Sequence, residues 1–167
     1  MPAISSALVP EAKIWAFEPN YENYYCTQNT IRINNLQNIE FQNAGLGETN
    51  SEANLLIRTP NGKNLGGSSK ITSSYEPELT IVVRIVSIDQ VIPSDRKISV
   101  IHLDVEGYEK QALSGALHTI QLNKPIIIME DNNDIIETEW FNSNILSLGY
   151  KIIGKVNNNH IIRFNSK

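Results

Sequence analysis

The apolar residues of this chain cluster in short runs with the length of β-strands, and helical patterns lie between several of them. Helices are predicted over residues 21–34 and 135–148, and over the stretch that carries Leu113, Leu117 and Ile120 at helical spacing. Strands that alternate with helices favour an α/β fold with a mainly parallel sheet. The predicted strands cover residues 13–17, 39–43, 53–58, 80–86, 98–103, 126–130, 150–156 and 160–164.

The last two predicted strands are separated only by residues 157–159, which are all asparagine. This spacing predicts a β-hairpin with a three-residue loop, which adds an antiparallel edge to the sheet. Residues 50–90 are interpreted as a β-rich insertion between two core units. The whole chain, residues 1–167, is expected to form a single domain.

Asparagine and aspartate mark the expected ends of the helices. Asn20 is a suitable N-cap for the first helix, and Asn35 is a suitable left-handed stop. Asp134 is the expected N-cap of the last helix, which ends at Gly149. The first helix is expected to carry an apolar side made of Tyr21, Tyr24, Tyr25 and Ile31.

The stretch over residues 98–116 organises the rest of the chain. An apolar run ends at Asp104, and the sequence then turns at Gly107 into a helical pattern, with Glu106 and Glu109 near the helix start. In an open α/β sheet, ligands bind at the carboxyl ends of strands, beside the free N–H groups of helix starts. These acids are therefore candidates for polar chemistry. The alternative is that Glu106 and Glu109 only complement the helix dipole.

Three predicted core strands end in an acidic residue. These residues are Glu18, Asp104 and Glu130. Because the carboxyl ends of parallel strands share one edge of a sheet, the three acids are expected to converge there. The sequence therefore predicts a polar site at this edge.

The composition is that of an ordinary globular chain, with 19% charged and 41% hydrophobic residues. The net charge of −4 argues against nucleic acid as a partner, because phosphate binding needs a basic face. Cys26 is the only cysteine, so an internal disulfide is excluded and a packing role is expected. No apolar run has the length of a membrane span and the start does not read as a signal peptide, so no membrane partner and a cytoplasmic location are expected.

The acidic strand ends lie within a set of motifs that follow one another in a fixed order. The motifs are Phe17-Glu18-Pro19-Asn20, Asn43-Ala44-Gly45-Leu46-Gly47, Asp104-Val105-Glu106-Gly107-Tyr108-Glu109, Gly115-Ala116 and the run from Pro125 to Glu130. In this order and spacing they resemble the FkbM-type family of S-adenosylmethionine-dependent methyltransferases, from about residue 7 to about residue 153. The resemblance implies a Rossmann-like class I methyltransferase sheet, with the terminal hairpin as its last two strands.

The resemblance also implies S-adenosylmethionine as the cofactor and assigns residues to it. Glu18, at the end of the family's second strand, would accept hydrogen bonds from the ribose hydroxyls, with Asn20 beside it. Asn43 and Ala44 match the turn after the third strand and would contact adenine. The alternative for Glu18 is a surface acid that stabilises the dipole of the following helix.

The catalytic assignment follows from the same resemblance. Asp104 is the candidate base that takes the proton of a hydroxyl on a sugar or small metabolite, with Glu106 and Glu130 in support. The alternative for Glu106 is that it only orients backbone N–H groups of its loop. The three acids could in principle hold a hard cation, but no ligand spacing demands one, so no metal is predicted.

The family's first strand and its glycine-rich loop should precede residues 8–10 and are not found in this sequence. Residues 4–10 are expected to be the tail of the helix that follows that loop. Without the first strand, the strands that end at Glu18 and Asp104 are expected to expose unpaired edges or to pair directly. The chain is thus expected to be a truncated methyltransferase domain, or an inactive remnant that binds a protein or a glycan. An exposed edge makes a homodimer a further expectation.

A polar, glycine-rich loop over residues 60–69 follows the strand at residues 53–58. It contains Lys63, Gly66, Gly67, Ser68 and Ser69. A long polar loop of this kind can cover an acceptor site, and it can equally be a surface turn.

Overall fold

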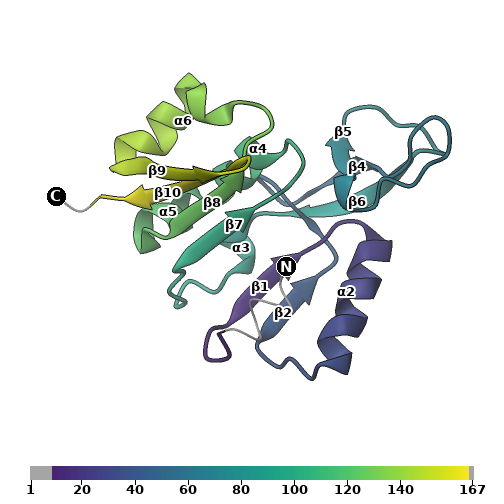
Figure 1. Cartoon of the computed structure of the whole chain (residues 1–167), viewed down its shortest axis with the longest axis horizontal. Helices are drawn as coiled ribbons and strands as arrows, with labels where there is room; N and C mark the ends of the chain where they lie inside the picture. The colour runs from purple at the N-terminus through teal and green to yellow at the C-terminus, as the bar shows by residue number, and fades with distance from the viewer. Residues whose placement is uncertain (1–8, 166–167) are drawn as a thin grey trace. The chain divides into compact units, whose positions relative to one another are not determined.

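The computed structural model describes residues 9–165, and the chain divides into two units (Figure 1). Of the described residues, the first unit contains 9–45 and 51–85, and the second contains 46–50 and 86–165. The helix tail expected over residues 4–10 falls largely outside the described residues. Each unit is described below by itself.

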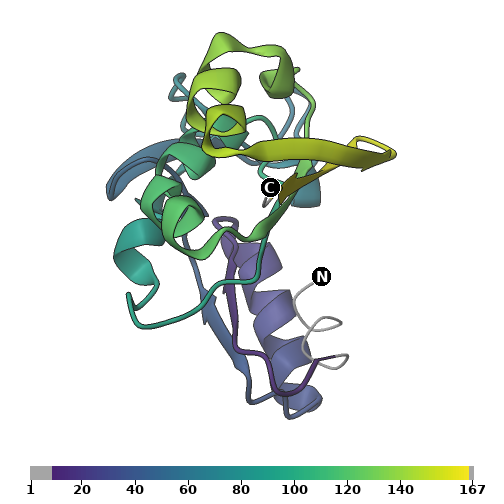
Figure 2. The same ribbon diagram turned by 90° about the vertical axis from the view of Figure 1, so that its left-hand side faces the viewer.

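A parallel pair of strands opens the first unit. Strand β1 (Ile14–Phe17) pairs with β2 (Ile39–Gln42) in continuous register, and helix α2 (Tyr21–Ile33) connects them. Both views place α2 alongside the two strands (Figures 1 and 2). A strand, a helix and a parallel strand in this order confirm the α/β pattern that the sequence predicts.

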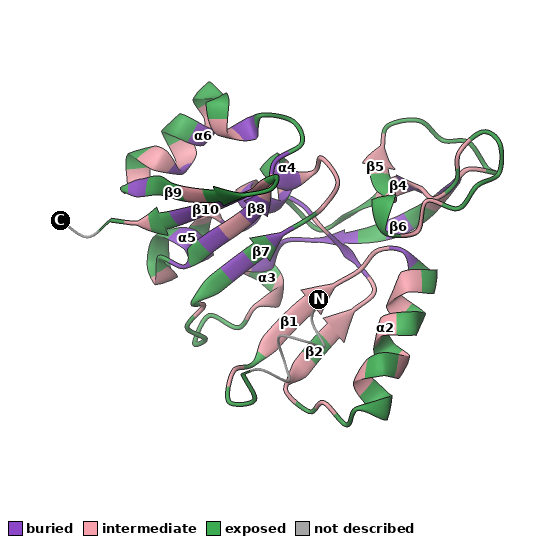
Figure 3. Ribbon diagram, viewed as in Figure 1, coloured by how far each residue is buried: buried purple, intermediate pink, exposed green. Residues whose placement is uncertain are grey.

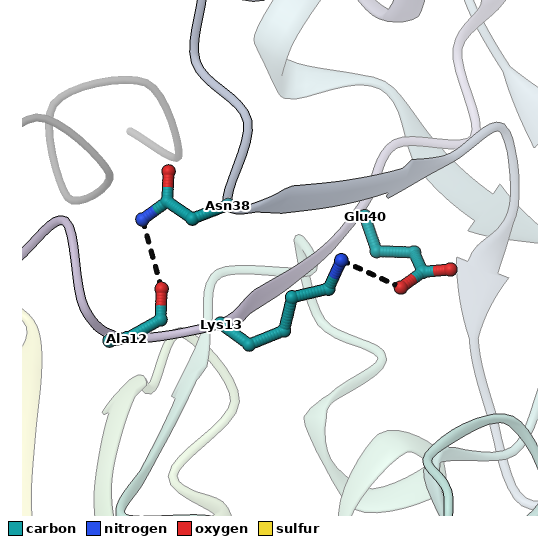
Figure 4. Close-up of polar contacts among 4 residues, drawn as sticks. All are labelled: Ala12, Lys13, Asn38 and Glu40. Atoms are coloured by element: carbon teal, nitrogen blue, oxygen red, sulfur yellow. Dashed lines mark hydrogen bonds and ion pairs between the residues drawn. The ribbon is translucent and has the colours of Figure 1, made fainter.

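Polar contacts hold the amino ends of β1 and β2 together (Figure 4). The Nδ2 atom of Asn38 donates to the carbonyl of Ala12 at 2.9 Å, and Lys13 Nζ lies 3.1 Å from Glu40 Oε2. The ion pair is well exposed on both sides, so it stabilises the fold little. The register of the pair therefore depends mainly on the backbone ladder and on Asn38.

Helix α2 has the predicted ends but not the predicted packing. The Asn20 side chain accepts from Glu22 N, and Asn35 has a left-handed φ of 50°. No residue of α2 is buried, and Tyr21 and Tyr25 are more than half exposed (Figure 3). The Tyr24 ring stacks on Phe41 of β2, with the two ring centroids 4.7 Å apart. Cys26 is also exposed, so its expected packing role is wrong.

A second sheet follows β2 along the chain. Its order is β3-β6-β4-β5, where the strands are β3 (Gly45–Leu46), β4 (Ser51–Leu56), β5 (Lys70–Thr72) and β6 (Thr80–Val86). Strand β4 pairs antiparallel with both β5 and β6. The core of this sheet consists of Leu55, Val83 and Ile85. Strands β3 and β5 are too short to be read from sequence. The glycine-rich loop between β4 and β5 contains the 3₁₀ turn η1 (Gly66–Ser68).

The second unit is built on a sheet with the order β7-β8-β10-β9. Strand β7 (Val100–Leu103) pairs parallel with β8 (Ile126–Glu130), and β10 (Asn159–Phe164) pairs antiparallel with β8 and with β9 (Tyr150–Val156). The terminal hairpin is confirmed. Its loop has two residues rather than three, because Asn159 already pairs with Val156. With its parallel and antiparallel sheets, the chain has the predicted α/β class.

Two helices replace the single helix predicted after Gly107. They are α4 (Glu109–Ser114) and α5 (Leu117–Asn123), and the short helix α3 (Ile88–Val91) precedes β7. The carbonyl of Gly115 accepts from Ser87 Oγ and Asp89 N instead of continuing the helix. The Asp89 carboxylate then accepts from the N–H groups of residues 118 and 119 and starts α5.

The predicted last helix is also divided. It consists of η2 (Ile135–Glu137), α6 (Glu139–Asn144) and η3 (Leu146–Leu148). Asp134 is not its cap, because this residue has a left-handed φ of 52° and its side chain makes no capping bond. Asp131 performs that role and accepts from the N–H groups of residues 135 and 136. Gly149 ends the segment with a φ of 102°, as predicted.

The core of the second unit lies between one face of its sheet and the helical segments (Figures 2 and 3). Burial alternates along β7 and β8, which is the expected pattern for a sheet covered on one face. The residues of this core include Ile101, Leu103, Leu113, Ile120, Ile127, Met129, Phe141, Ile145 and Ile162. In the order of their sheets, β1 and β7 are both edge strands. Among the described residues, no helix has the length and apolar character that a membrane span requires.

Candidate active site

Strand register brings two of the predicted catalytic acids together. Leu103 of β7 pairs with Met129 of β8, so Asp104 and Glu130 occupy the next positions at the carboxyl ends of two parallel strands. Carboxylate oxygens of Asp104, Glu106 and Glu130 all lie within 4.8 Å of one another. Acidic groups at this spacing can share a proton or hold a hard cation. The expectation from the sequence that this site holds no metal stays a prediction.

The surroundings of Glu130 favour the protonated form of its carboxyl. Its hydrogen bond with Asp104 raises the pKa of the Glu130 carboxyl above its ordinary value. Partial desolvation and the charges of Asp104 and Glu106 act in the same direction, and a hydrogen bond from Asn132 opposes them. The pair therefore keeps a proton to a higher pH than an isolated glutamate does, with Glu130 as the donor to Asp104.

Glu106 lies in a loop of unusual backbone conformation. Its φ is 53° and that of Gly107 is 95°, so two consecutive residues are left-handed. The buried Glu109 carboxylate accepts from Gly107 N at 3.0 Å, and Asn133 Nδ2 donates to the Gly107 carbonyl at 3.1 Å. Glu109 thus orients the Gly107 N–H. Asn133 could not be found from the sequence, because its contact with Gly107 joins residues far apart in the chain.

Glu18 belongs to the first unit and directly follows β1. Its Oε1 atom accepts from Asn20 N at 2.8 Å, at the amino end of α2. Burial raises the pKa of the Glu18 carboxyl, while the Asn20 N–H and the Asn23 side chain lower it by hydrogen bonding. The result is a partly buried carboxylate with fixed donors on one side, which suits recognition of a ligand hydroxyl.

The other predicted cofactor residues surround Glu18 in structural roles. Asn43 Nδ2 donates to the carbonyls of Glu18 and Pro19, at 2.8 and 3.1 Å, and so ties the ends of β1 and β2 together. Asn20 is 3% exposed and caps α2. Ala44 is fully buried. The structure thus groups Glu18, Asn20 and Asn43 in the first unit, and Asp104, Glu106 and Glu130 in the second.

The fold and its acidic strand ends define the class of the protein as an α/β domain with polar groups at the carboxyl ends of parallel strands. Comparison with known families makes this specific. The model of the Methyltransferase FkbM domain matches residues 4–163, and the chain belongs to this family. The members that give this family its name are methyltransferases, which use a methyl donor.

Comparison with solved structures supports the same fold. The chain is similar to a crystal structure of methyltransferase FkbM from Methylobacillus flagellatus KT, with a TM-score of 0.63 and 20% sequence identity. The match covers 96% of this chain and 40% of that one, so this chain spans less than half of that protein's length. No curated protein matches the sequence.

Proposed function

We propose that this chain is an S-adenosylmethionine-dependent methyltransferase domain that methylates a hydroxyl group on a sugar or a small metabolite. The observation that carries this proposal is the hydrogen-bonded carboxyl pair of Asp104 and Glu130, which lies at the strand ends of a family member. The net charge of −4 argues against nucleic acid as the acceptor. A cytoplasmic location is part of the same proposal.

The residues of the first unit fit the nucleoside part of this cofactor. Glu18 offers a partly buried carboxylate whose Oε1 already accepts from Asn20 N, which favours hydrogen bonding to a ribose diol. Asn43 keeps the backbone of Glu18 and Pro19 in place through two hydrogen bonds. The bound cofactor supplies a methyl group that is attached to a good leaving group.

Asp104 acts as the base in this proposal. The hydroxyl of the acceptor must lose its proton as it attacks a methyl group, and a carboxylate at this position can accept that proton. Where Glu130 is protonated, its carboxyl donates a hydrogen bond that orients the Asp104 carboxylate, and the raised pKa of Glu130 extends the pH range over which it does so. Glu106 adds negative charge beside the pair, which helps to keep that proton on Glu130.

A transfer assay tests this assignment. Purified protein is mixed with S-adenosylmethionine labelled in the methyl group and with a panel of sugars and small hydroxyl compounds. Asp104→Asn is expected to lower the transfer rate by about a hundredfold or more, because general base catalysis contributes that much. Asp95→Asn changes an exposed aspartate of the same unit and should leave the rate unchanged.

Two results would contradict the proposal. Equal rates for the wild type and Asp104→Asn would remove Asp104 as the base. A folded wild type that transfers no methyl group to any acceptor would instead favour the alternative of an inactive binding module.

A further inference from the structure

The glycine-rich loop of the first unit is hydrogen-bonded to the start of α2. Asn20 Nδ2 donates to Ser69 Oγ at 3.0 Å, and Asn23 Nδ2 donates to the Gly66 carbonyl at 3.1 Å. Within the loop, Ser69 Oγ donates to the Gly66 carbonyl at 2.7 Å. We call these four residues, Asn20, Asn23, Gly66 and Ser69, the helix–loop network.

A fourth side chain, that of Asn64, reinforces the network from the outside. Asn64 Nδ2 donates to Glu22 Oε2 at 2.7 Å, while Asn64 Oδ1 accepts from Gly66 N at 2.9 Å. Gly66 has a left-handed φ of 54°, which glycine adopts without strain because it has no Cβ atom. The loop is therefore fixed at both Gly66 and Ser69, which is more order than a surface turn requires.

The residues that hold the loop are also the ones that hold Glu18. The backbone N–H of Asn20 donates to Glu18 Oε1, and the Asn23 side chain hydrogen-bonds to the same carboxylate. Asn20 is 3% exposed, so its position depends on its bond partners rather than on solvent. A carboxylate with two fixed donors loses less freedom when it binds a ligand.

We propose that Ser69 and Asn23 are positioning residues that orient the Glu18 carboxylate through the helix–loop network, and so determine preference for a ribose over a deoxyribose in the bound nucleoside. This inference rests on the proposed function, since it assigns Glu18 to the ribose of the cofactor. The loop over residues 60–69 then belongs to the cofactor-binding residues of the first unit. This differs from both expectations for the loop, an acceptor cover and a surface turn.

The preference for ribose is the readout that separates positioning from a general structural role. Isothermal titration measures the affinity of the full chain for S-adenosylhomocysteine and for its 2′-deoxy analogue. Ser69→Ala is expected to weaken binding of the ribose compound about five- to tenfold while changing that of the deoxy analogue much less. Ser69→Thr keeps a hydroxyl and should recover most of the preference.

Ser68→Ala is the matched control, because Ser68 is an exposed neighbour in the same loop that lies outside the network. It should bind both compounds as the wild type does. Asn23→Ala is the second network variant and has an additional signature. The Asn23 hydrogen bond lowers the pKa of Glu18, so its loss should raise that pKa. As the pH is lowered, binding of the ribose compound should then begin to fail at a higher pH than in the wild type.

The outcomes distinguish this inference from the function on which it rests. If the wild type binds and Ser69→Ala and Asn23→Ala keep its ribose preference, the inference is overturned and the proposed function stands. The same holds if each variant loses affinity equally for both compounds. A folded wild type that binds neither compound overturns the proposed function, and the inference falls with it.

Discussion

At the scale of single residues, the chemistry of the second unit depends on two carboxyl groups placed too close to ionise independently. Asp104 and Glu130 follow paired positions of β7 and β8, and Glu106 adds a third acid within 4.8 Å. Close acids disfavour the charged state of one member, and here this is Glu130. Such an arrangement costs stability at neutral pH, which is common for functional sites.

The first prediction follows from the direction of this shift. The folded protein keeps the Glu130 proton at pH values above the ordinary pKa of 4.5. The contribution of this raised pKa to stability is therefore full below that value and is lost as the pH rises. Glu130→Gln cannot ionise and should therefore raise the free energy of unfolding at pH 7 by about 0.5 kcal/mol, a value reduced by solvent screening. Urea unfolding across the acid and neutral range measures it.

The gain from Glu130→Gln should disappear below the ordinary glutamate pKa, where the wild type is also protonated. Glu78→Gln removes an exposed charge in a turn and should change little at either pH. A Glu130→Gln variant that is less stable than the wild type at pH 7 would show that the ionised carboxylate is favourable in the fold.

Local pattern predicted the acids but not their partners. Glu18, Asp104 and Glu130 each follow a short apolar run, so their positions at strand ends could be read directly from the sequence. The hydrogen-bond partners of Asn133 and Ser69 could not be found in this way. Their bonds, to Gly107 and to Asn20, join segments 26 and 49 residues apart, and no local pattern encodes such a distance.

At the scale of elements, the break between α4 and α5 shows how tertiary contacts override helix periodicity. The apolar spacing of Leu113, Leu117 and Ile120 continues across the break, so the sequence predicts one helix. Bonds from Ser87 and Asp89 to the Gly115 carbonyl end the first helix. Because these donors precede β7, they lie outside any local window.

The second prediction concerns the close approach at this break. A Cβ atom at Gly115 would collide with the backbone carbonyl of Gly47, which cannot move as a flexible side chain can. Gly115→Ala should therefore lower the free energy of unfolding by about 2 kcal/mol. Chemical denaturation followed by circular dichroism measures the change.

Gly154→Ala provides the control in the same unit. A Cβ there meets only the Ile161 side chain at an ordinary distance of 3.9 Å, so stability should stay the same or rise slightly. Equal stability of the Gly115→Ala and Gly154→Ala variants would mean that the Gly47 segment does not pack on Gly115.

At the scale of the whole molecule, the sequence predicted the α/β class and the terminal hairpin, because alternation and length are local properties. It did not predict how the strands are shared among sheets. Among the described strands, β7 pairs with β8 alone, and Val100 of β7 is 51% exposed. An apolar edge strand offers unpaired backbone groups to another chain.

The third prediction is that the chain associates with itself through this edge. Size-exclusion chromatography with light scattering should give a mass above that of the 18.7 kDa chain at high concentration. Val100→Lys should shift the protein toward the monomer, since a charged edge resists pairing. Ile33→Lys changes an equally apolar, exposed residue of α2 and should not. A wild type that stays monomeric at every concentration would contradict this.

The central claim is that Glu18 binds the ribose of the methyl donor, and binding of S-adenosylhomocysteine tests it most directly. Isothermal titration should show micromolar binding by the wild type and a loss of about tenfold or more in Glu18→Gln, because a hydrogen bond to a charged group is removed. Glu40→Gln, an exposed glutamate on β2, should bind as the wild type does. Equal binding by Glu18→Gln, or no binding by the folded wild type at millimolar ligand, would contradict the account.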